Sequence, residues 1–308
     1  KDKHSISLSY TAFSTRERET YDIQGQYWLS NTSTATELAV GTYMEHARNR
    51  LNSSQHSLRL AYEYHNKGHH VEAGLGFRHE SIDERSREWE YRDSSGYSMP
   101  HNPEALEVIY NLRSNNNISS NHLEIYVQDT WRRETANSIF SLNYGLRLSH
   151  WSWNKEWLFS PRASLTYIPK NHDNMTFRLA TGLYYQRPFY KELRDTVTNG
   201  ATTIVQLNEN IQSQRSFQII AGYEYRFKLG KRPFLFSTEL YYKAQDRLNP
   251  YTVDNTKIVY YGRNCATGNV MGIDLKLYGE FVPGTDSWLT FSLMRARMNI
   301  NGKSIPQP

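Results

Sequence analysis

Strict alternation of apolar and polar residues over long segments constrains this chain more than any other feature. From Met175 to Tyr185 every second residue is apolar or a threonine, and the residues between them are mostly polar or small. A repeat of two is the period of a β-strand, whereas a helix repeats about every 3.6 residues. The pattern therefore predicts an all-β chain. The same alternation occurs over 58–64, 123–127, 140–148, 217–227, 234–242 and 271–281.

The length of these segments separates two classes of β protein. A soluble antiparallel sheet with one wet face would alternate in the same way. The segments here run for about 10–14 residues, whereas soluble strands average about 5–6 and a tilted membrane strand needs about 9–11. A mean hydropathy of −0.74 excludes a bundle of membrane helices, and 14% aromatic residues argue against disorder. We predict an antiparallel transmembrane β-barrel.

The connections between segments support a barrel with two different rims. One group is long, comprising 82–119, 188–212 and 248–264, and we expect it on the cell exterior. Aromatic residues next to the short connections are expected to form a girdle at the membrane surface. The short connections, expected in the periplasm, are 30–35, 66–68, 132–137, 169–174, 230–232 and 283–286.

The number of strands indicates a part of a larger barrel. We count about 13 strands in 308 residues, or about 24 residues per strand. A 22-strand barrel at this repeat would need roughly 530 residues. Unpaired strand edges are costly in lipid, so these strands need neighbours. We expect residues 1–308 to form part of one barrel domain, with the remaining strands and any plug domain outside this sequence.

Charge, cysteine content and motifs exclude several functions. The net charge of +5 is mild and its bases are dispersed, so we expect no nucleic-acid partner. Cys265 is alone, which rules out an internal disulfide. No phosphate-binding loop, nucleophile elbow or zinc helix motif is present, so we expect no enzyme and no cofactor. His65, His69 and His70 surround a tight turn, and we interpret them as solvated side chains rather than metal ligands.

Two groups of side chains are candidates for function. The first is expected to bind substrate at the outer rim, although girdle and loop-packing aromatics would show the same pattern. It comprises Trp89, Tyr97, Trp151, Trp153, Tyr184, Arg187 and Tyr190. The second group consists of charged residues expected to face the barrel lumen. It comprises Arg178, Glu224, Arg226, Asp274 and Lys276.

Several strand and turn motifs carry a family resemblance. The stretches 160–165, 176–182, 186–194, 272–277 and 279–288 resemble the central barrel of TonB-dependent outer-membrane receptors, particularly those of the Bacteroidetes. The resemblance covers roughly residues 7–306. In the turn Pro283-Gly284, proline presets φ and glycine supplies the left-handed position.

The resemblance implies an outer-membrane receptor that takes up a bulky nutrient, such as a siderophore, haem, cobalamin, glycan or peptide. It also implies energy coupling through the TonB–ExbB–ExbD complex, contact with outer-membrane lipid, and a surface lipoprotein as a further partner. In such a receptor the lumen-facing charges would contact the plug. The alternatives are a passive porin and a surface binding or adhesion protein that does not transport.

Overall fold

The computed structural model describes residues 3–31, 33–34, 36–93, 107–254 and 257–307. They form one twisted antiparallel sheet in which each long strand pairs with the next long strand of the chain. In the order of pairing, its strands are β1 (His4–Asn31), β2 (Thr36–Asn66), β3 (His69–Asp93), β4 (Glu107–Glu134), β5 (Ser138–Trp151), β6 (Glu156–Pro169), β7 (Met175–Gln186), β10 (Gln214–Leu229), β11 (Arg232–Leu248), β14 (Ala266–Val282), β15 (Thr285–Ile300) and β16 (Lys303–Gln307).

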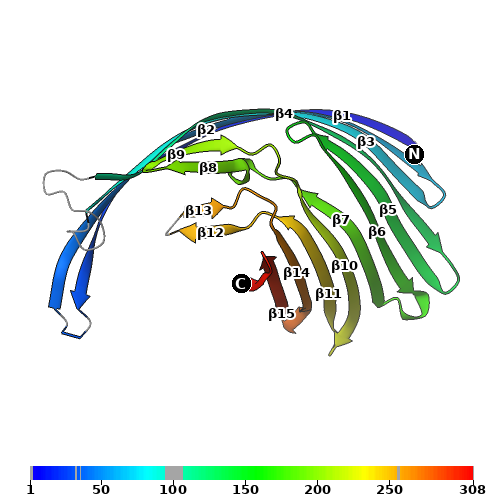
Figure 1. Cartoon of the computed structure of the whole chain (residues 1–308). Coiled ribbons are helices and arrows are strands. Elements are labelled where there is room, and N and C mark those ends of the chain that lie inside the picture. Colours follow the sequence, from blue (N-terminus) through cyan, green and yellow to red (C-terminus); the bar gives the residue numbers. More distant parts are fainter. Residues whose placement is uncertain (1–2, 32, 35, 94–106, 255–256, 308) are drawn as a thin grey trace.

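The sheet curves strongly, and the smaller elements lie on its concave side (Figure 1). These are the hairpin β8 (Arg194–Asn199) and β9 (Thr202–Leu207), and the hairpin β12 (Tyr251–Asp254) and β13 (Lys257–Tyr260). Two 3₁₀ turns, η1 (Lys170–His172) and η2 (Tyr190–Leu193), complete the secondary structure. Among the described residues, no helix has the length and apolar character needed to cross a membrane.

The convex face carries a continuous apolar band that crosses all the long strands before β16. Because residues opposite each other in the register share a face, Leu60, Leu75 and Ile125 lie side by side on β2, β3 and β4. On average these three side chains remain almost half exposed, at 44%, 46% and 46%. So much exposed apolar area is expected only where lipid covers it. The band continues through Leu146, Leu179, Ile219, Leu240, Ile273 and Leu293.

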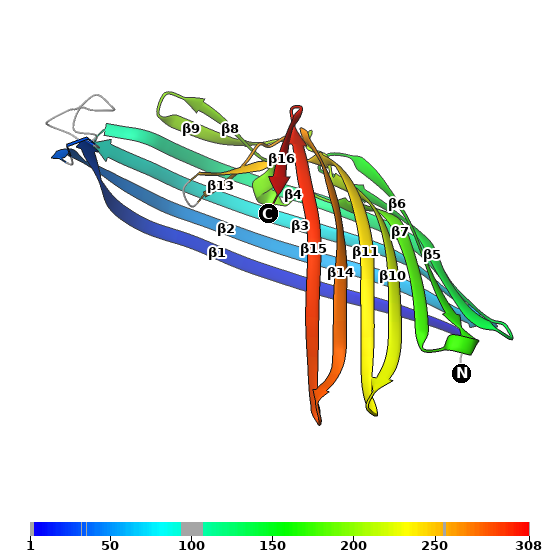
Figure 2. The same cartoon turned by 90° about the horizontal axis from the view of Figure 1, so that it is seen from below.

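Strands β1–β4 continue far beyond this band (Figure 2). β1 has 28 residues and β2 has 31, although a tilted membrane strand needs only about 9–11. Beyond Tyr10 and Phe77 the convex face is mostly polar, although Trp28 and Val108 on it are 58% and 40% exposed. We therefore place this part of the sheet in water. We call residues 13–31, 36–55, 80–93 and 107–120 the extension. β9 pairs with β4 at its outer end in parallel, along the edge that β5 leaves open.

Two of the expected connections are placed differently by the structure. Residues 30–35 were expected on the same rim as 66–68, but β1 and β2 are single continuous strands, so their hairpin lies at the opposite end of the sheet. The expected long connection 82–119 consists mostly of strand, because β3 continues to Asp93 and β4 begins at Glu107. Both faces of these strand segments are largely polar, so they show no apolar period of two in the sequence.

Most of the remaining connections follow the expected asymmetry. At one rim, which we call the short-turn rim, all five connections have two to five residues. At the Pro283-Gly284 turn, Gly284 has φ of +77°, which confirms the expected left-handed position. At the other rim, the long-loop rim, residues 187–213, 249–254 and 257–265 fold back over the concave face (Figure 1). The connections 152–155 and 301–302 at the long-loop rim are also short.

Candidate functional site

The main core of the described structure lies where the 187–213 connection packs on the concave face. We call this cluster the inner junction. It forms because η2 inserts apolar side chains between the extension and the end of β5, and these have no lipid to cover them. Its buried members are Ile82, Ile118, Trp151, Tyr190, Leu193 and Ile211, with Leu51, Trp153 and Leu207 packed against them.

A carboxylate lies within the inner junction. Glu84 is only 4% exposed and accepts hydrogen bonds from the hydroxyls of Ser86, Ser114 and Tyr190, the last at 2.8 Å. Three donors replace the water that burial removes, as a buried charge requires. Burial raises the pKa of the Tyr190 hydroxyl, and the negative charge of Glu84 acts in the same direction. Tyr190 therefore remains a neutral donor that anchors η2 to β3.

A second polar chain joins the same connection to β3 and β4. Arg187 donates a hydrogen bond from Nη1 to Nδ1 of His122 at 2.6 Å, and Nε2 of His122 lies 3.3 Å from a Glu80 oxygen. Burial lowers the pKa of the His122 imidazole, and Arg187 also lowers it, against the hydrogen bond to Glu80. A neutral imidazole fits this geometry, because Nδ1 must accept while Nε2–H donates. The ring stacks on Trp151 at 5.7 Å.

Trp151 and Trp153 contribute donors that the fold does not use. Trp151 is 3% exposed, and Trp153 is half-buried beside it. Neither indole Nε1 has a hydrogen-bond partner among the described residues. Tryptophan N–H groups usually find a partner when buried. The inner junction therefore holds two indole donors, and Arg187 is joined to one of them, Trp151, through the His122 ring. Such donors can bind polar groups of a ligand.

The structure brings four of the seven expected binding residues together, namely Trp151, Trp153, Arg187 and Tyr190. Tyr184 lies on β7, where Arg162 covers its ring at 4.3 Å. Trp89 was expected in a long loop, but this was wrong. It lies in β3 on the convex face, stacked on His46 at 4.9 Å and covered by Arg48. Tyr97 lies outside the described residues.

Sequence reasoning missed the partners that hold this cluster, namely Glu80, Glu84 and His122. A signal was present, because glutamates occupy even positions and arginines odd positions from Glu84 to Glu88. An alternation of opposite charges places them on opposite faces of a strand.

The concave face below the inner junction is lined by mixed charges. Arg178 on β7 forms two hydrogen bonds with Glu224 on β10, at 2.6 and 3.2 Å, and Arg226 lies 3.6 Å from the same carboxylate. Asp274 and Lys276 lie on the same face, opposite Glu239 and Ser237 in the register. These five residues share the concave face, so they belong to the surface that a barrel of this curvature would enclose.

Charge is sorted between the two faces of the extension. Among the residues of the extension whose side chains the structure describes, the register places seven glutamates and one arginine, Arg92, on the concave face. The convex face carries seven arginines and three aspartates. The concave glutamates are Glu17, Glu19, Glu45, Glu80, Glu84, Glu88 and Glu90. The convex arginines are Arg16, Arg18, Arg48, Arg50, Arg85, Arg87 and Arg113.

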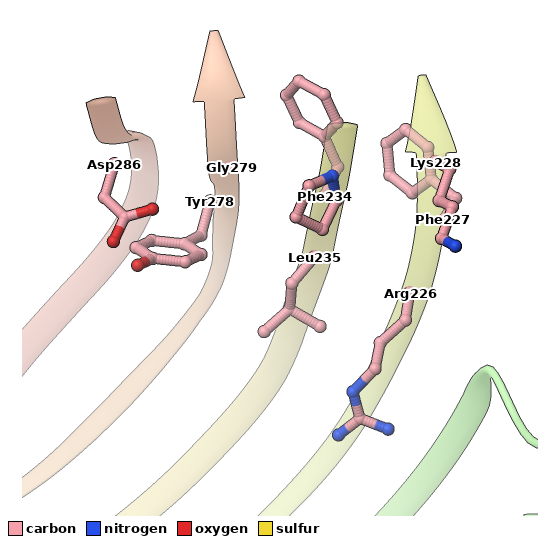
Figure 3. Close-up of a pocket in the computed structure, with 9 residues that line it drawn as sticks. Arg226, Phe227, Lys228, Phe234, Leu235, Tyr278, Gly279 and Asp286 are labelled. Atoms are coloured by element: carbon pink, nitrogen blue, oxygen red, sulfur yellow. The ribbon is translucent and has the colours of Figure 1, made fainter. Parts of the chain in front are cut away.

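A hollow of about 350 Å³ lies at the short-turn rim, between the ends of β10, β11, β14 and β15 (Figure 3). Phe227 and Phe234 stack beside it at 5.6 Å, and Phe281 meets Phe234 edge-on at 5.3 Å. Amphipathic and aromatic rings gather in this way at a membrane surface. The hollow therefore belongs to the aromatic girdle and is not a counterpart of the inner junction.

Comparison with known proteins identifies the family. Residues 2–308 match the family model described as "TonB dependent receptor-like, beta-barrel". No curated protein matches the sequence.

Solved structures share the fold at low identity. The outer-membrane transporter YddB from Escherichia coli has 12% identity and a TM-score of 0.55, with 98% of this chain and 49% of YddB covered. The copper transporter OprC has 14% identity and a TM-score of 0.52, covering 94% of this chain and 48% of OprC. The RagAB peptide transporter has 10% identity and a TM-score of 0.51, covering 95% and 35%. The chain thus spans about half or less of these proteins.

The apolar convex band, the charged concave wall and the two unequal rims agree with the match over almost the whole sequence. The chain belongs to the TonB-dependent receptor β-barrel family of the Gram-negative outer membrane.

Proposed function

We propose that this chain forms the wall of a TonB-dependent importer that takes up a bulky nutrient, with the inner junction as part of its substrate site. The observation that carries the proposal is the pair of unused indole N–H groups on Trp151 and Trp153, with Arg187 joined to Trp151 through the His122 ring. Such donors occur on the long-loop rim of the concave face, where an incoming ligand would arrive. The half-buried ring of Trp153 would stack on the ligand, and the indole N–H groups and Arg187 would bind its polar groups.

The charge of the extension favours one of the substrate classes considered above. Seven glutamates on its concave face create a negative potential on the side from which a ligand would approach. This potential attracts cationic groups and repels anionic ones. A peptide with basic residues therefore fits better than an anionic siderophore.

The partners of the intact receptor follow from the same proposal. Transport against a gradient needs energy, which the TonB–ExbB–ExbD complex would deliver to a plug domain within the complete barrel. A surface lipoprotein would contact the long-loop rim, where the extension projects from the membrane. Outer-membrane lipid covers the convex band.

Uptake by the intact receptor tests the role of Arg187. We expect Arg187→Gln to weaken ligand binding roughly tenfold to hundredfold, because a hydrogen bond to a charged group contributes about 1.5–3 kcal/mol. Arg215→Gln is the matched control. Arg215 lies at the same rim but on the convex face, paired with Asp246 at 2.6 Å. Uptake and affinity are measured at equal surface abundance, with a basic peptide and a ferric siderophore as ligands.

Trp153→Phe provides a second variant that keeps the ring and removes the indole donor. We expect it to weaken binding severalfold, whereas Trp157→Phe on the convex face leaves binding unchanged. If both inner-junction variants bind and import every ligand normally, the cluster serves only to pack the 187–213 connection. Import by a receptor without its TonB partner would instead indicate a passive porin.

A further inference from the structure

The three histidines around the turn between β2 and β3 do not share one face of the sheet. His69 lies on the convex face, where its Nδ1 is 2.7 Å from a carboxylate oxygen of Asp129. His65 and His70 lie on the concave face, directly opposite each other in the register. Their rings stack with centroids 4.0 Å apart and planes inclined by 20°. His69 is thus paired with Asp129 on one face of the sheet, whereas His65 and His70 stack on each other on the opposite face.

Two glutamates adjoin the histidine pair on the same face. Glu63 and Glu72 lie directly opposite each other, one step further along the hairpin. Donor atoms of Glu63, His65 and His70 all lie within 4.8 Å of one another. A Glu72 oxygen is 3.5 Å from Nε2 of His70. Four ligand-forming side chains therefore occupy the corners of one patch, which we call the hairpin quartet.

The pairing within this quartet is unfavourable without a cation. Like charges directly opposite each other destabilise an antiparallel pair, and Glu63 faces Glu72. Nε2 of His70 is shielded from solvent and makes no hydrogen bond with any described residue. A divalent cation would neutralise the carboxylates and use the free nitrogen lone pair. With the cation bound, the facing carboxylates would no longer repel each other and would act as ligands.

The surrounding structure holds the quartet in register. The hairpin turns at Lys67 and Gly68, whose φ values are +30° and +91°. Gly68 also accepts a hydrogen bond from the backbone N–H of Arg132 at 2.6 Å, and a Cβ there would approach the Arg132 carbonyl to 2.5 Å. Gln128 donates to the second oxygen of Glu72 at 2.7 Å, as groups behind a metal ligand do.

In place of the solvated histidines expected from the sequence, we propose that Glu63, His65 and His70, assisted by Glu72, bind a divalent first-row transition metal such as Zn²⁺ at the short-turn rim of the concave face. Imidazole nitrogens and carboxylate oxygens are ligands that Zn²⁺ accepts in tetrahedral sites. Bound there, the metal ties β2 to β3 where the hairpin ends. The site is independent of the inner junction, which lies at the opposite rim.

Zinc affinity of the intact receptor tests this site. The receptor is purified in detergent without a polyhistidine tag, and Zn²⁺ is titrated in competition with a chromophoric chelator. We expect His70→Ala and His65→Ala to lose one bound Zn²⁺ or to weaken it at least tenfold. His69→Ala is the matched control, because it removes a histidine from the same turn but from the other face. It should bind Zn²⁺ like the native receptor.

Glu63→Gln keeps the proposal testable if a histidine variant fails to fold, and it should also weaken binding. Hydrogen exchange gives a second readout, since Zn²⁺ should slow exchange in residues 63–72 of the native receptor and not of His70→Ala. Equal loss of affinity in His69→Ala and His70→Ala would overturn the site. So would a native receptor that binds no more Zn²⁺ than the double variant His65→Ala/His70→Ala.

Discussion

At the scale of single residues, His122 decides how the 187–213 connection is attached. Its neutral ring accepts from Arg187 on one side and faces Glu80 on the other, so it links a cation to an anion without carrying charge itself. Protonation would remove the acceptor at Nδ1 and place a second positive charge 2.6 Å from the guanidinium. Protonation of Nδ1 of His122 would therefore weaken the attachment of the 187–213 connection.

This geometry predicts the direction of a pH effect. The folded pKa of His122 lies below the unfolded value of about 6.5, so its contribution to stability is complete above that pH and decreases as the pH falls below it. Tryptophan fluorescence of the intact receptor in detergent should shift between pH 7.5 and 5.5, because Trp151 stacks on the ring. His122→Gln, which does not titrate, should remove this shift. An equal shift in the variant would assign the transition to another group.

At the scale of one element, β14 shows how alternation separates lipid from lumen. Leu275 faces Phe291 and Thr238 on the convex side, while Lys276 faces Thr290 and Ser237 on the concave side. Of two adjacent residues in one strand, one thus faces lipid and the other faces the polar lumen. The free-energy cost of a charge should depend on which of the two positions receives it.

We therefore expect Leu275→Arg to lower the free energy of unfolding by about 2–4 kcal/mol, because the arginine would enter the lipid-facing band. Lys276→Leu should change it by much less. The measurement is a denaturant titration of the receptor refolded into lipid bilayers, followed by the shift of the folded barrel on a gel. Similar effects of the two substitutions would contradict the assignment of the faces.

The elements differ in how much the sequence reveals of them. Strands with an apolar face, such as β7 and β14, are apparent from periodicity, and so is the turn at Gly284. The extension is not, because both of its faces are polar and only the sign of the charge alternates. The inner junction could be anticipated in part. Trp151 and Arg187 could be predicted as binding residues from their side-chain types. The roles of Glu84 and His122 are apparent only once strands distant in sequence are paired.

At the scale of the whole molecule, the two rims define an orientation across the membrane. Short turns belong to the periplasmic side of outer-membrane barrels and longer loops to the exterior. The hairpin of β8 and β9 and the extension lie at the long-loop rim, while the turn before β15 lies at the other (Figure 2). We infer that the extension points away from the cell.

Thiol labelling of whole cells tests this orientation. A cysteine at Ala201, in the exposed turn between β8 and β9, should react with a membrane-impermeant maleimide. One at Thr285 should react only after the outer membrane is broken. The native Cys265 is replaced by serine in both variants. Labelling at Thr285 alone would reverse the topology.

The length of the extension also sets the range over which its charges act. Residues 13–31 of β1 rise about 3.3 Å each, so the strand reaches roughly 60 Å beyond the band. At physiological ionic strength the Debye length is only about 8 Å. The tip is thus electrically independent of the lipid headgroups. The two charged faces lie only about 10 Å apart, close to one Debye length, so each partly screens the other. A molecule in contact with the concave face meets mainly glutamates, and one in contact with the convex face meets mainly arginines.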